Sequence, residues 1–457
     1  MQKSIFREYD IRGVVERDLT PEVVRDIGQA VGSLAAERGE TCIAVGRDGR
    51  LSSPRLCEAL KIGIRAAGLE VIDLGAVSTP LLYYATHTLS DTRAGVMVTG
   101  SHNPPDYNGL KIVIDKIALH GAVIRDLRRR IETGDVRHGH GGERSANIRI
   151  EYIRRISAAL PLPRPLKVVV DCGNAIASRT APPLLRDLGC EVVELYCEVD
   201  GRFPNHHPDP SLPENLADLQ AAVIEHQADI GLAFDGDADR LGVVTNTGEI
   251  IWPDRILMPL AEEVLTRHPG AAVVYDIKCS RHLTRLIERF GGQPILWKTG
   301  HSLIKAKMRE TGALLGGEMT GHLVHADDWF GFDDAFYAAA RLLRLLAQQT
   351  RSSHEFFAAY PTGLITPELR VDMAEGEPFA FMERLATQAD FGPDARLITL
   401  DGLRVEFPDA WGLVRASNTT PSLVLRFEAD QPAAMTDIQE RFRRQLLRLQ
   451  ADLALPF

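Results

Sequence analysis

The chain alternates short apolar runs with segments of helical periodicity. Cys42–Val45 predicts a strand, Ser53–Ala67 a helix that Gly68 ends, and Val71–Leu74 the next strand. Short β-branched runs are typical of buried strands, and a strand, a helix and a strand in this order form a βαβ unit. The pattern therefore predicts a mostly parallel sheet near the start of the chain.

The same order of elements occurs twice more. Leu166–Val170 begins the second copy, whose helix stops at Gly189, and Ala272–Tyr275 begins the third, whose helix stops at Gly291 and Gly292. The stop glycines of the three copies lie roughly 100–120 residues apart, which fits whole domains better than the short units of a solenoid. Any α/β protein can repeat the order strand, helix and strand by chance, so the repetition alone does not show that the three copies are related. In each copy, however, polar residues follow the first strand directly, where α/β sheets place ligands. We therefore expect three related α/β domains.

The end of the chain departs from this pattern. Strand-like segments at 362–371, 402–407, 411–415 and 422–427 precede a helical period over Met435–Leu449. We expect an α/β protein with three related mixed-sheet domains and a smaller C-terminal α+β domain around a central cleft. The expected limits of the four domains are 1–147, 148–250, 251–361 and 362–457.

Composition agrees with a folded protein and narrows its partners. The chain has 457 residues, and about 150 residues per domain gives roughly three domains. Apolar residues make up 45 % and charged residues 25 %, which excludes disorder for most of the chain. The formal net charge of -10 disfavours non-specific nucleic-acid binding, which depends on neutralising phosphates. A site for an anionic metabolite must then be locally basic.

Cysteine use and hydropathy indicate a cytoplasmic protein that binds no membrane and no nucleic acid. The six cysteines include no Cys-x-x-Cys pair, which is typical of reduced, mostly buried thiols rather than of a zinc ribbon or a thioredoxin motif. The N-terminus lacks an apolar core of signal-peptide length. No apolar run approaches the ~18 residues that would span a bilayer.

The first motif with chemical potential follows the apolar strand Ala94–Val98. In Thr99–Pro105 (TGSHNPP), Ser101 stands in a turn of Gly, Asn and Pro. A serine so exposed and rigidly placed suits a nucleophile or a phosphate carrier. A Ser-His-Asp hydrolase is disfavoured, because the chain has no Gly-x-Ser-x-Gly elbow and His102 adjoins Ser101. On its own, the motif is explained equally well by a turn that caps the strand.

The second motif, DGDADR, follows the strand Ile230–Phe234. It contains three alternating carboxylates, from Asp235, Asp237 and Asp239. Their mutual repulsion in one loop indicates a hard divalent cation. The spacing is not that of an EF-hand, because Arg240 occupies position six and Asn246 position twelve. Arg240 beside the cation suits a phosphate-bearing partner, and a solvated acidic turn is the alternative.

Two later loops carry polar groups. Gly317–His322 (GEMTGH) would present a carboxylate and a hydroxyl on one side, a pair that grips adjacent sugar hydroxyls. Arg415–Pro421 (RASNTTP) offers a guanidinium, hydroxyls and an amide, which can form a phosphate cradle in a chain without a P-loop lysine. Either loop alone is also compatible with an ordinary polar turn. Further polar positions occur at Tyr9–Gly13, Lys278 and Thr299–His301.

Taken together and in this order, the four motifs resemble the α-D-phosphohexomutase superfamily, and most closely its bacterial phosphomannomutases/phosphoglucomutases. The resemblance covers the chain from Phe6 to Asp430. It implies an isomerase that interconverts hexose 1-phosphate and hexose 6-phosphate, of glucose and mannose, through a phosphoserine and a bisphosphorylated sugar. It also implies Mg²⁺, glucose 1,6-bisphosphate or its mannose equivalent as activator and intermediate, and a monomer that binds sugar phosphates.

The resemblance assigns roles to residues of this sequence. Ser101 would carry the phosphoryl group and bind Mg²⁺ together with Asp235, Asp237 and Asp239. The reacting group would be surrounded by Tyr9, Arg12, His102, Lys111 and Arg240. The substrate would be bound by Tyr9, Arg12, Lys278, His301, Glu318, Met319, Thr320, Gly321, His322, Arg415, Ser417, Asn418 and Thr419. The proton acceptor stays open among Lys111, His102 and His322.

Three positions bear on the alternatives. Ala238 stands where the family usually has Gly, and its methyl group opposes a positive φ, although the spacing of the ligands survives. Thr320 replaces the common Ser and keeps the hydroxyl. Met319 stands where phosphoglucosamine mutases usually have Gln, which argues against that alternative. The complete set of serine, aspartates and arginine argues against a non-catalytic sugar-phosphate-binding protein.

The implied reaction places demands on the cleft. The bisphosphorylated sugar must turn by about half a turn without being lost, so the site must enclose it and also loosen. We expect the C-terminal domain to act as a movable lid. Cations from distant parts of the chain should make the cleft positive wherever a phosphate sits, namely Arg12, Lys111, Lys278 and Arg415.

Overall fold

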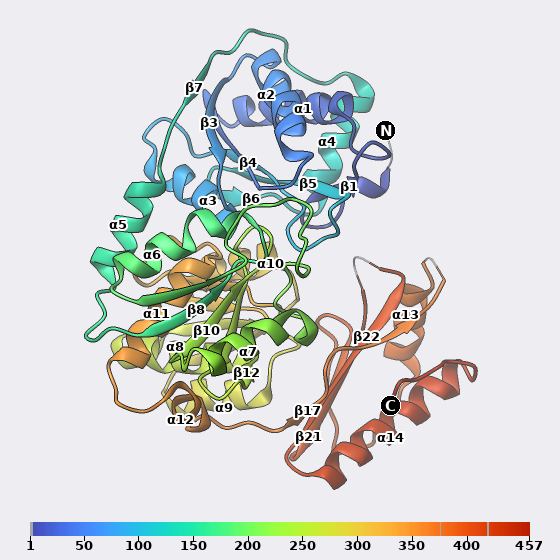
Figure 1. Cartoon of the computed structure of the whole chain (residues 1–457). Coiled ribbons are helices and arrows are strands. Elements are labelled where there is room, and N and C mark those ends of the chain that lie inside the picture. Colours follow the sequence, from blue (N-terminus) through green and yellow to red (C-terminus); the bar gives the residue numbers. More distant parts are fainter. Residues whose placement is uncertain (1–2, 375, 418–419) are drawn as a thin grey trace.

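Four β-sheets follow one another along the chain in the computed structural model (Figure 1). The structure describes residues 3–374, 376–417 and 420–457. The first three sheets are mixed and are packed with helices, and the fourth is antiparallel. The predicted fold class, three related α/β domains and a smaller C-terminal α+β domain, is confirmed.

The first two sheets are formed by the N-terminal half of the chain. In chain order, the first domain contains β1 (Ile11–Val14), α1 (Pro21–Glu37), β2 (Cys42–Arg47), α2 (Ser53–Ala66), β3 (Glu70–Ala76), α3 (Thr79–Thr88), β4 (Gly95–Val98), β5 (Tyr107–Ile114), β6 (Ile117–Ala118), α4 (Ala122–Thr133) and β7 (Glu143–Ser145). The second is built from α5 (Arg149–Ala159), β8 (Lys167–Asp171), α6 (Ala181–Asp187), β9 (Glu191–Leu195), α7 (Ala217–Glu225), β10 (Ile230–Phe234), β11 (Leu241–Thr245) and β12 (Ile250–Ile251).

The other two sheets follow in the C-terminal half. The third domain contains α8 (Pro253–Arg267), β13 (Ala272–Asp276), α9 (Arg281–Arg289), β14 (Gln293–Trp297), α10 (His301–Thr311), β15 (Leu315–Gly317), β16 (Leu323–His325), α11 (Ala335–Ala347) and α12 (Ser353–Ala358). The last contains β17 (Leu364–Ile365), β18 (Leu369–Asp372), α13 (Glu377–Gln388), β19 (Arg396–Ile398), β20 (Leu403–Glu406), β21 (Ala410–Ala416), β22 (Ser422–Ala429) and α14 (Pro432–Leu449).

The first three sheets share one strand order. It reads β3-β2-β4-β5 in the first, β9-β8-β10-β11 in the second and β14-β13-β15-β16 in the third. In each sheet, the first three strands of this order are parallel to one another. The fourth strand pairs antiparallel with the third. The repeat predicted from strand, helix and strand is therefore a repeat of whole sheets.

The predicted boundaries differ from the structure in a few places. Gly68 and Gly189 end their helices with φ of 92° and 87°, and of the two glycines predicted to stop the third helix it is Gly291 that has a positive φ, of 73°. The limit predicted between residues 250 and 251 falls inside β12, which pairs with β11. The pattern of the sequence also did not predict α13 and β19, which are mostly exposed and carry a weak apolar signal.

One apolar core joins the first three domains. A single cluster of buried side chains contains Ala44 of β2, Val168 of β8, Val273 of β13 and Phe357 of α12. The C-terminal domain has its own core around Phe427. In Figure 1 this domain, coloured orange to red, lies to one side of the other three. The fold thus consists of a three-domain body and one separately packed domain.

Two expectations about the whole chain can be compared with the structure. All six cysteines are free thiols, and all are buried except the half-buried Cys197. Within the described part of the chain, no helix is both long and apolar enough to cross a membrane.

Candidate active site

Three of the four motifs occupy the same place in their domains. The loop with Ser101 follows β4, the aspartate loop follows β10, and the GEMTGH loop follows β15. Each is the loop between the third and the fourth strand of the shared order. Ligands of α/β sheets bind outside the carboxyl ends of the strands, so equivalent loops of three sheets can meet at one site.

Ser101 lies against the aspartate loop of the second domain. Its hydroxyl donates a hydrogen bond to Asp235 Oδ2 (2.8 Å), and its Oγ lies 3.2 Å from His102 Nδ1. The sequence predicts an exposed serine, but the structure buries it, with 2 % of its surface exposed. The reason is the close approach of Gly236, where a Cβ atom would lie 2.0 Å from the Ser101 carbonyl oxygen. A turn that merely caps the strand would not explain the hydrogen bond from Ser101 to Asp235.

The three aspartates converge as the alternating pattern predicts. All are fully buried, and one oxygen of each lies within 4.8 Å of the others. Among the residues that the structure describes, Asp237 Oδ1 and Asp239 Oδ1 have no hydrogen-bond partner. Buried oxygens with free lone pairs are costly alone and are the ligands that Mg²⁺ prefers. The residues present therefore fit a hard divalent cation. A solvated acidic turn is excluded by the burial.

Ala238 in the aspartate loop has an unfavourable backbone conformation. This residue adopts a φ of 62°, although its methyl group opposes that conformation. For an L-residue the left-handed region costs roughly 1–2 kcal/mol, so the surrounding structure must hold the loop in this shape. The spacing of the carboxylates survives, as the sequence predicts.

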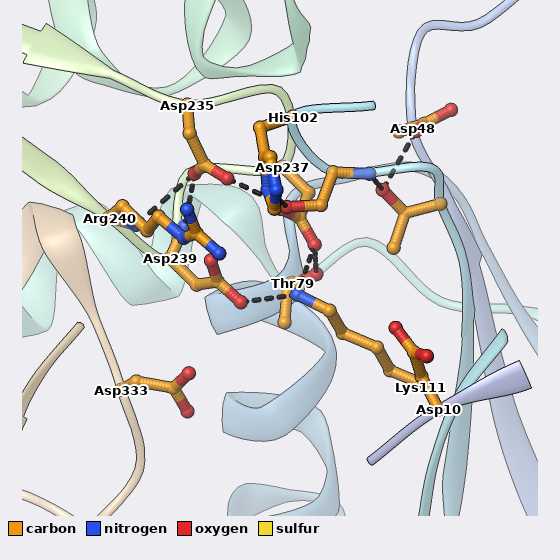
Figure 2. Close-up of polar contacts among 12 residues, drawn as sticks. Asp10, Asp48, Thr79, His102, Lys111, Asp235, Asp237, Asp239, Arg240 and Asp333 are labelled. Carbon is orange, nitrogen blue, oxygen red and sulfur yellow. Dashed lines mark hydrogen bonds and ion pairs between the residues drawn. The ribbon is translucent and has the colours of Figure 1, made fainter. Parts of the chain in front are cut away.

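A buried lysine partly neutralises the aspartates. Lys111 on β5 donates from Nζ to Asp237 Oδ2 (2.7 Å) and also to Asp239, and Figure 2 shows it reaching both carboxylates from one side. Burial lowers the pKa of Lys111, but the charges of Asp237 and Asp239 outweigh burial and raise it well above its usual value. Burial and the repulsion of the same two carboxylates raise the pKa of Asp235.

A histidine connects this group to the third domain. Arg240 Nε donates to His322 Nε2 (3.1 Å), so the neutral ring carries its hydrogen on Nδ1 and donates it to Asp333 Oδ2 (2.9 Å). Lys305 Nζ lies 2.6 Å from the other oxygen of Asp333. The rings of His301 and His322 stack with centroids 5.0 Å apart. Burial, together with the charge of Lys305, lowers the pKa of His301 to about 4.

The GEMTGH loop presents its polar groups as expected. The Thr320 hydroxyl donates to Glu318 Oε2 (3.1 Å), so the two groups lie on one side. The backbone N–H of Gly300 donates to the other oxygen of Glu318, and burial raises the pKa of this carboxyl. The neighbouring contacts are Tyr9 hydroxyl to Thr299 oxygen (2.8 Å), Met319 N–H to Asp276 Oδ1 (3.3 Å) and Leu241 N–H to Gly321 oxygen (3.1 Å).

The four cations expected to make the cleft positive each have a carboxylate partner. The pairs are Arg12 with Asp10 (2.5 Å), Lys111 with Asp237 (2.7 Å), Lys278 with Glu368 (2.5 Å) and Arg415 with Asp401 (3.1 Å). These cations are almost fully buried, and a buried charge without a partner is strongly unfavourable. Asn418 and Thr419 lie outside the described residues, and the neighbouring Ser417 accepts a bond from Thr420 N–H (3.2 Å).

The same four domains occur in a known family. Four family descriptions match consecutive parts of the chain: phosphoglucomutase/phosphomannomutase alpha/beta/alpha domains I (residues 3–138), II (150–248) and III (252–362), and the C-terminal domain (368–445). The chain belongs to the phosphoglucomutase/phosphomannomutase family. The resemblance drawn from the motifs is thereby confirmed.

Relatives within the phosphoglucomutase/phosphomannomutase family match over the whole length. The phosphomannomutase/phosphoglucomutase of Pseudomonas aeruginosa is 54 % identical over 454 residues, which cover 99 % of this chain and 98 % of the relative. The phosphoglucomutase of Neisseria gonorrhoeae is 49 % identical over 444 residues, or 96 % of each chain. A crystal structure of a family protein from Burkholderia thailandensis superposes with a TM-score of 0.96 at 48 % identity and covers 100 % of both chains.

The phosphoglucomutase/phosphomannomutase site also contains residues that the motifs did not indicate. Thr79 donates its hydroxyl to Asp237, Asp333 accepts from His322, and Asp48 and Arg50 lie beneath the Ser101 loop. Thr79 and Asp333 stand outside polar clusters of the sequence, and only the folded chain reveals them. Asp48 and Arg50 occupy the loop after the first strand of the repeat, a position that could have been compared between the three copies.

Proposed function

We propose that the chain interconverts hexose 1-phosphate and hexose 6-phosphate, of glucose and of mannose, by way of a phosphorylated Ser101. One observation carries the proposal: the Ser101 hydroxyl of the first domain bonds to Asp235 of the second, inside the cluster of three buried carboxylates. The high identity to family members named for both sugars supports this choice of substrates.

In this proposal, Asp235, Asp237 and Asp239 hold Mg²⁺ together with an oxygen of the phosphorylated Ser101. When bound, the metal ion would offset negative charge on the phosphoryl group that is transferred. The two carboxylate oxygens without partners, Asp237 Oδ1 and Asp239 Oδ1, support these ligands.

The cations of the site then orient and neutralise the reacting phosphate. Lys111 is buried and Arg240 half-buried next to the carboxylates, and phosphoryl transfer depends mostly on positioning and charge stabilisation. Lys111 is a poor proton acceptor, because its raised pKa keeps it protonated. The proton acceptor stays open between two histidines. His102 Nδ1 lies 3.2 Å from Ser101 Oγ, whereas the Nε2 lone pair of His322 accepts from Arg240 Nε and becomes available only when that bond breaks.

The remaining residues bind the rest of the substrate. Glu318 and Thr320 bind sugar hydroxyls, with Tyr9 and His301 near them. Arg12, Lys278, Arg415 and Ser417, with Asn418 and Thr419, bind the phosphates, and an incoming phosphate takes the place of the carboxylate that now faces each paired cation. Such an exchange keeps each buried cation neutralised before and after binding.

The C-terminal domain acts as the lid. It has a core of its own and meets the third domain through a small apolar cluster of Ile277, Trp411 and Leu413 and through polar contacts, such as Arg404 donating to the carbonyl oxygens of Ile277 and Cys279, both at 2.7 Å. A domain with its own core can move as a unit while the sugar turns. The proposal includes glucose 1,6-bisphosphate, or its mannose equivalent, as intermediate and activator.

The decisive assay mixes the purified protein with glucose 1-phosphate, Mg²⁺ and a trace of glucose 1,6-bisphosphate and measures glucose 6-phosphate. Mannose 1-phosphate and glucosamine 6-phosphate are tested in parallel, and a preference for glucosamine would favour a phosphoglucosamine mutase. Ser101→Ala should lower turnover by several orders of magnitude. Absence of product from both glucose and mannose phosphates would reject the proposal. Intact-mass detection of a phosphate on Ser101 distinguishes the enzyme from a sugar-phosphate-binding protein.

A monomeric, cytoplasmic enzyme completes the proposal. The free, mostly buried thiols support a reducing compartment. Light scattering during size-exclusion chromatography tests the monomer.

A further inference from the structure

Arg50 is a buried cation that binds the backbone of the Ser101 loop. It contacts none of the side chains assigned above to substrate or metal. It lies in the loop between β2 and α2, with 1 % of its surface exposed. Its two terminal nitrogens donate to four carbonyl oxygens of the Ser101 loop, those of Ser101 (2.7 Å), Asn103 (2.5 Å), Pro104 (2.5 Å) and Tyr107 (3.1 Å). One planar group thus holds the backbone of the loop from Ser101 to Tyr107.

Asp48 completes the same arrangement. Its Oδ2 accepts from the Thr99 hydroxyl (2.8 Å) and from the Gly100 N–H (3.1 Å), and it faces Arg50 Nε at 3.3 Å. Gly100 is required for this packing, because a Cβ atom there would lie 2.5 Å from Arg50 Cζ. The guanidinium also lies 5.1 Å from the centre of the Phe203 ring, which the second domain contributes. Two side chains of the first domain, Asp48 and Arg50, therefore hold the Ser101 loop.

The conformation of Ser101 needs such support. Its φ of 47° lies in the left-handed region, which costs a residue other than glycine roughly 1–3 kcal/mol. A strained backbone persists only where surrounding contacts determine it. The Ser101 carbonyl oxygen bonds to Arg50, and the Ser101 hydroxyl bonds to Asp235. Fixing the carbonyl therefore fixes the backbone from which the hydroxyl projects, and the bond to Asp235 sets the direction of the hydroxyl.

The internal repeat shows what is particular to Arg50. In the third domain, Asp276 ends β13 and Lys278 comes two residues later, much as Asp48 directly follows β2 and Arg50 comes two residues after it. Asp276 Oδ1 accepts from Met319 N–H (3.3 Å), much as Asp48 accepts from Gly100, so both aspartates anchor the functional loop of their domain. Lys278, however, turns away to Glu368 of the C-terminal domain. Only in the first domain does the cation bind its own loop.

We propose that Arg50 is a positioning residue for the phosphorylated serine, and this proposal rests on the function proposed above. The guanidinium holds the Ser101 loop so that the hydroxyl points at the carboxylates of the second domain. Lysine cannot replace it, because an ammonium group is a point donor and cannot span carbonyl oxygens from Ser101 to Tyr107 while facing Asp48.

The test compares Arg50→Lys with Arg55→Lys on the full-length protein. Arg55 belongs to the helix that follows the same loop, and its side chain is 52 % exposed. In Arg50→Lys we expect kcat to fall about 100-fold, the loss typical of a misplaced reacting group, with KM for glucose 1-phosphate within about threefold. We expect Arg55→Lys to keep both values. An equal kcat for Arg50→Lys and the wild type would overturn the proposal.

Hydrogen exchange provides a readout that does not depend on activity. In Arg50→Lys, amides of the peptide 99–107 should exchange at least ~10-fold faster, while the core strands β8 and β13 keep their protection. Unchanged exchange in this peptide would overturn the proposal even if activity were lost. If the wild type itself has no mutase activity, the proposed function fails, and accelerated exchange would still show that Arg50 holds the loop.

A second variant covers the case in which Arg50→Lys does not fold. Asp48→Asn keeps the size of the side chain and removes the charge that faces Arg50. We expect faster exchange in the same peptide and a lower kcat with little change in KM. Wild-type exchange and kcat in a folded Asp48→Asn protein would contradict the proposed arrangement.

Discussion

Lys111 Nζ lies 2.7 Å from Asp237 Oδ2, so a cation of the first domain is inserted between carboxylates of the second. The two residues are separated by 126 positions in the sequence, and both are almost fully buried. The contact joins the frame of Ser101 to the proposed metal loop. It also places a fixed positive charge beside the position of the divalent cation.

Lys111→Met should therefore tighten the binding of Mg²⁺ and slow the reaction. Removing the repelling charge is expected to lower the dissociation constant of Mg²⁺ about tenfold, which corresponds to ~1.4 kcal/mol. The same change removes charge stabilisation of the phosphoryl group, and kcat should fall roughly 10²–10³-fold. Isothermal titration calorimetry with MgCl₂ on the unphosphorylated protein measures the first effect. Lys116→Met, at an exposed position of the same hairpin, is the control, and equal affinities in both variants would contradict the prediction.

Gly236→Ala should separate the Ser101 loop from the aspartate loop. The added Cβ atom would lie 2.0 Å from the Ser101 carbonyl oxygen, which is backbone and cannot rotate away. We expect kcat to fall ~100-fold or more, and the free energy of unfolding to fall by about 1–3 kcal/mol, as for overpacking. Gly142→Ala is the matched control, because its nearest neighbour is a side-chain atom at 3.9 Å. Kinetics and denaturant unfolding of both variants check the prediction, which a wild-type kcat for Gly236→Ala would refute.

The pair between Lys278 and Glu368 should make stability depend on pH. Lys278 lowers the pKa of Glu368 to about 2, from 4.5 in an unfolded chain. The pair therefore stabilises the fold above about pH 4.5, and this stabilisation is lost as the pH falls toward 2. Because the Glu368 side chain is 31 % exposed, we expect Glu368→Gln to cost only about 1 kcal/mol at pH 7.

Thermal unfolding of the wild type and Glu368→Gln between pH 3 and pH 7 measures this dependence. The difference in Tm should be largest at neutral pH and should shrink below pH 4.5. A difference that stays constant over this range would show that the charge of Glu368 is not what stabilises the domain contact.

Asp333→Asn should impair catalysis more than binding. The carboxylate accepts the Nδ1 hydrogen of His322 and faces Lys305 at 2.6 Å. Its replacement in comparable His–Asp pairs costs up to ~10⁴ in kcat through the wrong tautomer, and we expect a loss of roughly 10²–10⁴-fold with a nearly unchanged KM. Asp328→Asn, a nearby exposed carboxylate, should behave like the wild type. Steady-state kinetics decide, and a kcat near that of the wild type would remove Asp333 from the mechanism.

Much of the fold follows from local patterns. The apolar runs at Cys42–Val45, Leu166–Val170 and Ala272–Tyr275 predict the first strands of three related sheets, and a glycine with positive φ ends the helix after each of them. These features depend on neighbours within a few residues, so the sequence displays them directly. By contrast, α13 was not predicted, although its buried residues Pro378, Phe381 and Leu385 recur at helical spacing and Phe381 packs in the C-terminal core.

The candidate site divides in the same way. The residue types and spacing of DGDADR were sufficient to predict three convergent carboxylates, because one loop supplies all of them. The burial of Ser101, in contrast, results from Gly236, which lies 135 positions away. The pairing of the phosphate-binding cations was likewise not visible in the sequence, because partners such as Asp401 and Glu368 come from other segments.

The sequence by itself determined the repeated order of strands and helices along the chain, the loops that carry chemistry and the ligand types of a proposed divalent cation. Only the tertiary structure decided that Ser101 is buried against Asp235, that Lys111 lies among the aspartates, that Arg50 bonds to the Ser101 loop and that Asp333 bonds to His322. The physical reason is the distance along the chain over which each interaction acts. Hydrophobic periodicity and turn chemistry act between neighbours in the chain, whereas the neutralisation of buried charge requires whichever partner the packing of the domains brings close.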